Sequence, residues 1–209
     1  MNEFLDTIRR VVRGIMGEVA IGLNTLTGGR ITPNSITITS LVMHIPIALL
    51  IALQSYASAA MLLVIFGLFD TLDGELARLQ RKSSSSGMLL DATTDRMKEV
   101  LLYTGAANAI VAVGRPYMTI WAVLACGGSL LVSYVKAKGE TAVAAKIPAT
   151  EINKLFQDGL MRFEVRMFIL VLGLLSGRVI LAVMFIAITA WATAFGRLIR
   201  IMNRLESRA

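Results

Sequence analysis

Four aspartates stand close together in a largely apolar part of this 209-residue chain: Asp70, Asp73, Asp91 and Asp95. A separation of three residues places the first pair on one face of a helix, and a separation of four does the same for the second pair. If a short loop makes these helices antiparallel neighbours, all four carboxylates can converge at one depth. Converging carboxylates repel one another unless a cation neutralises them, and oxygen ligands favour Mg²⁺, Mn²⁺ or Ca²⁺. We therefore expect a divalent metal site, and two ions would suit phosphoryl chemistry.

Small and basic residues accompany the aspartates. Gly74 lacks a side chain directly after Asp73, and Ala77 keeps the next turn small, so that a ligand can approach the backbone closely. Small residues also allow tight helix packing in membranes, and alone they would favour that simpler role. Arg78 can bind phosphate or mark the cytoplasmic end of a helix. Beside four carboxylates, the pattern favours a nucleotide cleft.

The composition is that of an integral membrane protein. The chain is 56% hydrophobic and 17% charged, with a mean hydropathy of +0.69, whereas soluble domains are about 45–50% apolar and about 25% charged. The single histidine, His44, and the single cysteine, Cys126, lie in apolar sequence. A zinc site is therefore not expected, and a general base must be sought among the carboxylates.

The apolar residues form blocks of about the 20 residues that a spanning helix needs. We expect an all-α membrane fold in which residues 31–209 form one domain of six transmembrane helices. Residues 1–30 are expected to form an amphipathic helix, which lies on the membrane surface or on the protein's own cytosolic face. The six predicted spans are residues 35–56, 58–81, 87–113, 116–138, 159–176 and 178–203.

Basic residues predict the orientation of these spans. Only Arg115 and Arg178 fall on connectors of one side, and the other nineteen of the twenty-one basic residues fall on the opposite side or at its helix ends. By the positive-inside rule, both termini and the aspartates face the cytoplasm of a cell membrane. The net charge of +7 then reflects anionic lipid headgroups and not nucleic acid. The long connector 139–158 is expected at the surface.

The pattern D-x2-D-G-x2-A-R-x8-G-x3-D-x3-D, from Asp70 to Asp95, resembles the signature of the CDP-alcohol phosphotransferase family. The surface helix, the six spans and the TPN turn at 32–34 agree with that family. The resemblance implies a membrane enzyme of phospholipid biosynthesis, of the EC 2.7.8 type. Such an enzyme transfers a phosphatidyl group from CDP-diacylglycerol or a similar lipid to an alcohol and releases CMP. Members of the family are often homodimers, which implies a homodimer here.

The same resemblance implies a role for each residue of the pattern. Asp70, Asp73 and Asp91 would bind two ions of Mg²⁺ or Mn²⁺. Asp95 would add a metal ligand and act as the catalytic general base that takes the proton of the acceptor hydroxyl. Residues that would line the CDP-lipid site are Asp73, Gly74, Ala77, Arg78 and Gly87.

The acceptor alcohol must be selected by residues outside the signature. Lys136, Arg166 and Arg197 lie deeper in apolar sequence than the other cations, and three helices that present cations suit an acceptor carrying phosphate. The simpler alternative is that they contact lipid headgroups. The SYVKAK stretch at 133–138 resembles the phosphatidylinositol-phosphate synthase branch, which implies inositol phosphate, with glycerol 3-phosphate as the alternative.

Two other classes of protein are considered. Membrane prenyltransferases also use Mg²⁺ and aspartate-rich helices, but usually with more spans and a different spacing. A divalent cation transporter would leave the glycine, alanine and arginine positions of the pattern unexplained. It would also predict acidic residues along a path through the bilayer, whereas these cluster at one end.

Overall fold

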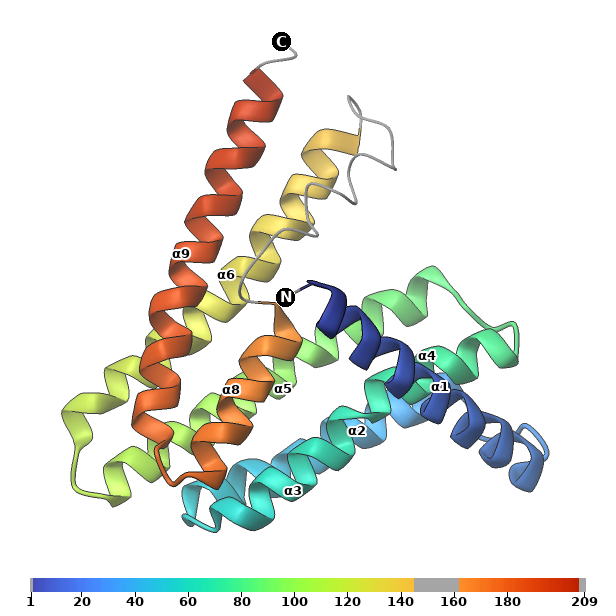
Figure 1. Ribbon diagram of the computed structural model, residues 1–209, viewed down its shortest axis with the longest axis horizontal. Helices are drawn as coiled ribbons and strands as arrows, with labels where there is room; N and C mark the ends of the chain where they lie inside the picture. The colour runs from blue at the N-terminus through green and yellow to red at the C-terminus, as the bar shows by residue number, and fades with distance from the viewer. Residues whose placement is uncertain (1, 145–161, 207–209) are drawn as a thin grey trace. The chain divides into compact units, whose positions relative to one another are not determined.

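The computed structural model describes residues 2–144 and 162–206, and these residues form helices and no strand (Figure 1). The all-α expectation is thereby confirmed for the described part of the chain. The contacts divide the chain into two compact units, which are described separately. The first unit comprises Met1–Leu50 and Ser58–Leu102, and the second comprises Ile51–Ala57 and Tyr103–Ala209.

The first unit contains the aspartates and the N-terminal helix. Its helices are α1 (Asn2–Thr27), α2 (Pro33–Ala52), α3 (Tyr56–Gly67), α4 (Phe69–Leu79) and the first part of α5 (Ser85–Ala112). Helix α1 lies across α4, as Figure 1 shows.

The contact between α1 and α4 is an apolar core. Ala20 of α1 is buried with Leu72 and Leu76 of α4 and with Ile36 of α2. This face of α1 therefore packs on the protein itself, as one of the two expected arrangements requires. A second face leaves apolar side chains exposed, namely Val11, Ile15, Val19 and Leu26.

A polar contact fixes the ends of α1 and α4 to each other. The side-chain amide of Gln80, directly after α4, donates hydrogen bonds to Asn24 Oδ1 at 2.9 Å and to the Ile31 carbonyl at 2.8 Å. Because both acceptors belong to the end of α1 and the turn that follows it, the start of α2 is held beside the end of α4.

Helices α3 and α4 are two pieces of one apolar segment, which is interrupted at Leu68. The Leu68 nitrogen is shared at 3.3 Å between the carbonyls of Val64 and Ile65. The hydroxyl of Ser40, on α2, donates to the Phe66 carbonyl at 3.0 Å. A side chain that enters the backbone hydrogen-bond ladder is a known cause of helix breaks. Asp70 therefore lies in the first turn of a new helix.

The second unit is built around the pair α6 and α9. Its helices are η1 (Pro116–Met118), α6 (Thr119–Ala144), α8 (Phe163–Leu175) and α9 (Val179–Glu206), and α9 contacts both α6 and α8. A side chain at Gly128 would come within 2.9 Å of the Trp191 ring, so the glycine lets that ring pack closely. The Trp191 indole donates to the Leu124 carbonyl at 3.0 Å.

Four helical segments of the described chain are long and apolar enough to cross a membrane: Pro33–Ala52, Tyr56–Leu79, Pro116–Ala142 and Val179–Glu206. Helices α5 and α8 coincide with the predicted third and fifth spans. However, α5 contains several charged residues and the described α8 has only 13 residues, so the count of six spans stays a prediction. The predicted connector 139–158 begins within α6, and its residues from 145 onward lie outside the described residues.

Candidate active site

Three of the four aspartates converge. Asp70 on α4 and Asp91 and Asp95 on α5 each offer a carboxylate oxygen, and these oxygens lie within 4.8 Å of one another. We call these three residues the carboxylate cluster. Asp91 Oδ1 is buried and has no hydrogen-bond partner among the described residues. Buried polar atoms are normally satisfied, so an unsatisfied oxygen among hard ligands fits a divalent cation.

The fourth aspartate, Asp73, lies outside this group of three but is close enough to experience the charges of Asp91 and Asp70. It is only 6% exposed. The hydroxyl of Thr37, on α2, donates to Asp73 Oδ2 at 2.5 Å. One oxygen of Asp73 is therefore oriented by a neighbouring helix.

A polar stripe on α2 faces the aspartates. It consists of Thr37, Ser40 and His44, which are all buried and are separated by three and four residues on one helix face. Besides its bond to the Phe66 carbonyl, the Ser40 hydroxyl lies 3.4 Å from Asp70 Oδ1. His44 Nδ1 lies 2.7 Å from the Ser40 carbonyl. Sequence reasoning considered His44 alone, although the polar spacing was visible within the apolar segment.

A lysine also belongs to the site. The Lys98 side chain is 1% exposed, and its Nζ lies 2.5 Å from Asp70 Oδ1 and 3.3 Å from Asp95 Oδ1. Arg96 contributes a longer contact to Asp95, at 3.6 Å. Sequence reasoning missed Lys98. Its position three residues after Asp95, on the same face of one helix, was the available signal.

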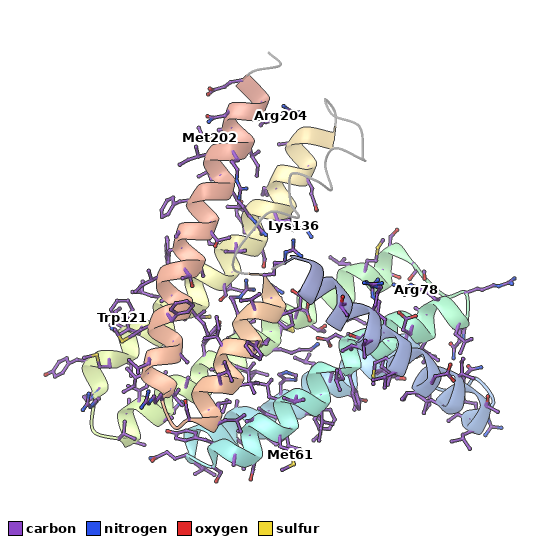
Figure 2. All side chains as sticks on the ribbon, in the orientation of Figure 1. Met61, Arg78, Trp121, Lys136, Met202 and Arg204 are labelled. Carbon is purple, nitrogen blue, oxygen red and sulfur yellow. The ribbon has the colours of Figure 1, made fainter. Side chains whose placement is uncertain are left out.

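The residues expected to line the CDP-lipid site occupy different environments. A Cβ built on Gly74 meets no atom within 4 Å outside its own helix and chain neighbours, so space is open there. Ala77, half-buried on the same helix, adds only a methyl group. Arg78 is 58% exposed, points away from α4 in Figure 2, and pairs with Glu75 at 2.5 Å.

The remaining glycine of the pattern, Gly87, also has a structural function. Its nitrogen donates to the hydroxyl of Ser84 at 3.1 Å, which is a helix-capping contact at the start of α5. A Cβ on Gly87 would come 3.2 Å from that hydroxyl oxygen and 3.6 Å from Asn34 Oδ1. The side chains of Ser84 and Asn34 therefore leave little room for a Cβ, which is one reason for glycine at position 87.

Two of the three predicted acceptor residues are buried in the second unit. Arg166 on α8 is 1% exposed and Arg197 on α9 is 5% exposed. Arg197 Nη1 donates to the Val132 carbonyl at 3.2 Å, while its Nε is buried without a hydrogen-bond partner among the described residues. Arg197 also experiences the positive charges of Arg166, Arg200 and Arg162. Two buried arginines with further positive charges near them suit an anionic ligand.

Lys136 differs from the two arginines. Its side chain, labelled in Figure 2, is 51% exposed and lies 3.8 Å from Glu140 one turn later on α6. Exposed ion pairs of this kind contribute little to stability. Its burial and contacts therefore do not distinguish it from an ordinary surface lysine.

The family is now evident. Residues 30–196 match the sequence model of the CDP-alcohol phosphatidyltransferase family, and the chain belongs to that family. It is therefore a membrane enzyme that transfers substituted phosphate groups in phospholipid synthesis, as the aspartate pattern predicts.

Individual relatives agree with this assignment. The chain is 30% identical to phosphatidylinositol phosphate synthase of Corynebacterium glutamicum, over 84% of this chain and 77% of the relative. It is 29% identical to archaetidylinositol phosphate synthase of Pyrococcus horikoshii, over 87% of this chain and 89% of the relative.

Solved structures show the same fold. The crystal structure of Mycobacterium tuberculosis phosphatidylinositol phosphate synthase with CDP-DAG bound matches with a TM-score of 0.75 and 23% identity, over 90% of this chain and 93% of the other. The same enzyme in complex with manganese and citrate also gives 0.75, with 24% identity over 90% and 88% of the chains.

Proposed function

We propose that this enzyme transfers the phosphatidyl group of CDP-diacylglycerol, or of a similar CDP-lipid, to inositol phosphate and releases CMP. The observation that carries the proposal is the carboxylate cluster with its unsatisfied Asp91 oxygen. A homologous enzyme was crystallised with CDP-DAG, which supports the proposed donor. The matched relatives are synthases of inositol phospholipids, which supports the proposed acceptor.

The first unit supplies the metal and donor sites in this proposal. Asp70, Asp73, Asp91 and Asp95 hold two ions of Mg²⁺ or Mn²⁺. Manganese in a homologous structure supports this class of metal. Such ions neutralise a pyrophosphate and make its phosphorus more electrophilic. Open space at Gly74 and the small Ala77 admit the nucleotide, whose phosphates Arg78 can reach once it leaves Glu75. Gly87 lines the same site.

Asp95 acts as the general base. The acceptor hydroxyl gives its proton to the Asp95 carboxylate as its oxygen bonds to the phosphorus nearest the diacylglycerol. The bond from that phosphorus to the oxygen of CMP breaks, and CMP leaves. No covalent enzyme intermediate is needed, because the metal ions that the four aspartates would hold neutralise the pyrophosphate and Asp95 provides the base.

The acceptor phosphate is assigned to Arg197 and Arg166, with Lys136 as a weaker contributor. Support comes from their burial and from the buried Arg197 Nε, since guanidinium groups bind phosphate through several hydrogen bonds. Glycerol 3-phosphate carries the same group and remains the alternative acceptor. The names of the relatives favour inositol phosphate.

The membrane arrangement completes the proposal. Six spans lie in the cell membrane with the termini and the active site on the cytoplasmic side, and the enzyme works as a homodimer. The exposed apolar face of α1 contacts the membrane surface, supported by Val11, Ile15, Val19 and Leu26.

An acceptor screen tests the proposed reaction. Purified enzyme in detergent is given CDP-diacylglycerol and Mg²⁺ or Mn²⁺, with inositol phosphate, glycerol 3-phosphate or free inositol, and CMP release is measured. We expect acceptor-dependent CMP with inositol phosphate and none after chelation of the metal. Faster CMP release with glycerol 3-phosphate than with inositol phosphate would identify glycerol 3-phosphate as the acceptor instead. Absence of CMP with every polyol phosphate would overturn the proposal.

A further inference from the structure

The ammonium group of Lys98 places a full positive charge inside the carboxylate cluster. Its residue is completely buried, and its ammonium touches two members of the cluster, Asp70 and Asp95. Burying an ammonium is costly unless it is paired, and removing one partner of a buried pair leaves an uncompensated charge. The lysine and the aspartates therefore depend on each other.

The two contacts join different helices. Asp70 belongs to α4, whereas Asp95 and Lys98 lie one turn apart on α5. The ammonium thus holds together carboxylates that would otherwise repel each other across the helix pair. At the same time it uses one oxygen of each, Oδ1 in both cases.

Arg96 does not duplicate this role. Its nearest contact to Asp95 is 3.6 Å long, its side chain is 24% exposed, and it also pairs with Glu99 at 3.2 Å. Among the described residues, Lys98 is the cation whose ion pairs join α4 to α5.

We propose that Lys98 is a positioning residue and the built-in counter-cation of the carboxylate cluster, which keeps Asp70 and Asp95 together without metal and weakens the binding of divalent cations. A fixed positive charge in contact with two ligands repels an incoming ion and competes for the same oxygens. The consequence is a site whose metal is held less tightly than four aspartates alone would hold it. This inference rests on the metal site of the proposed function.

Neutral variants at Lys98 test the inference. In the full-length protein in detergent, Lys98→Met and Lys98→Gln should lower the dissociation constant for Mn²⁺ at least about tenfold, because a repulsive charge next to the ion is lost. Free Mn²⁺ is measured by electron paramagnetic resonance. Without metal both variants should melt at a lower temperature than the native protein, and saturating Mn²⁺ should raise their melting temperatures more than it raises the native one.

Two controls separate charge from other effects. Lys98→Arg keeps the charge and should bind Mn²⁺ within about threefold of the native protein. Lys82→Met removes an exposed lysine after α4 and should leave Mn²⁺ affinity unchanged.

The outcomes distinguish two failures. If the native protein binds no Mn²⁺, the metal site of the proposed function is wrong. If it binds Mn²⁺ and both neutral variants bind it equally or more weakly, the role of Lys98 is wrong. Failure of both variants to fold even in saturating Mn²⁺ also overturns it, because the ion should substitute for the lost ammonium.

Discussion

The Thr37 hydroxyl, on α2, donates to Asp73 Oδ2, on α4, at 2.5 Å, in a buried environment. This bond connects the first apolar helix of the chain with the aspartate pattern 36 residues later. It leaves the other Asp73 oxygen available to a ligand. The α2 helix thus helps to orient Asp73, and it is also a candidate membrane span.

Removing this donor should impair the site and leave the fold in place. Thr37→Val has nearly the same shape but no hydroxyl, and a hydrogen bond to a charged group contributes about 1.5–3 kcal/mol. We expect the dissociation constant for Mn²⁺ and the KM for the CDP-lipid to rise about tenfold, measured by Mn²⁺ titration and by CMP release. Thr37→Ser should restore both values. Native constants in Thr37→Val would show that the bond does not orient Asp73.

Gly74 offers a test of the donor site that is separate from folding. Because a Cβ there meets no neighbour within 4 Å, and alanine is about 1 kcal/mol more favourable than glycine in a helix, Gly74→Ala should be at least as stable as the native protein. We nevertheless expect at least about tenfold weaker CDP-lipid binding, because the proposed donor site brings the nucleotide close to the backbone at this position.

Gly22→Ala is the matched control for Gly74→Ala, because a Cβ at Gly22 also meets nothing within 4 Å. It should keep native donor binding. Thermal melting and a titration with CDP-lipid are measured on both variants. Native donor affinity in Gly74→Ala would place the nucleotide elsewhere.

The role of Asp95 can be separated from metal binding. Asp95→Asn keeps the shape of the side chain but cannot take a proton, and general bases typically contribute about 10²–10⁴-fold to rate. Turnover should fall at least about a hundredfold while the CDP-lipid still raises the melting temperature. Asp91→Asn, the comparison variant, should lose Mn²⁺ affinity. If Asp95→Asn loses Mn²⁺ affinity to the same extent as Asp91→Asn, Asp95 is chiefly a metal ligand.

Acceptor recognition should depend on Arg197 more than on Lys136. Arg197→Lys retains a positive charge but loses the guanidinium fork, so the KM for inositol phosphate should rise about tenfold or more with little change in the KM for the CDP-lipid. Lys136→Met should have a smaller effect, because that side chain is half exposed. Lys138→Met, which alters an exposed lysine of the same helix, serves as control. Equal changes in both KM values would reject an acceptor site at Arg197.

The sequence predicted the parts of the site that helix geometry determines. Asp70 and Asp73 do lie one turn apart on α4, and Asp91 and Asp95 do lie one turn apart on α5. Residues three or four apart always lie on the same face of a helix. The all-α fold followed from apolar blocks of the length that a spanning helix needs, and the family followed from the spacing of the aspartate pattern.

The contacts that support the aspartates could not be predicted in this way. Ser40 reaches the Phe66 carbonyl across 26 residues of sequence, and only tertiary packing creates such a pair. Lys98 lies near the middle of α5, and its burial against two aspartates likewise depends on the packing of α4 on α5.

The break at Leu68 has a consequence for a protein that works in a fluid solvent. In a continuous helix, any rotation that adapts the lipid-facing side chains of α3 would re-aim Asp70 and Asp73 by the same angle. At the interruption between α3 and α4, the Ser40 hydroxyl ties the segment to α2, and the Thr37 hydroxyl holds Asp73 one turn further on. The orientation of these aspartates therefore depends on contacts with α2 as well as on α3.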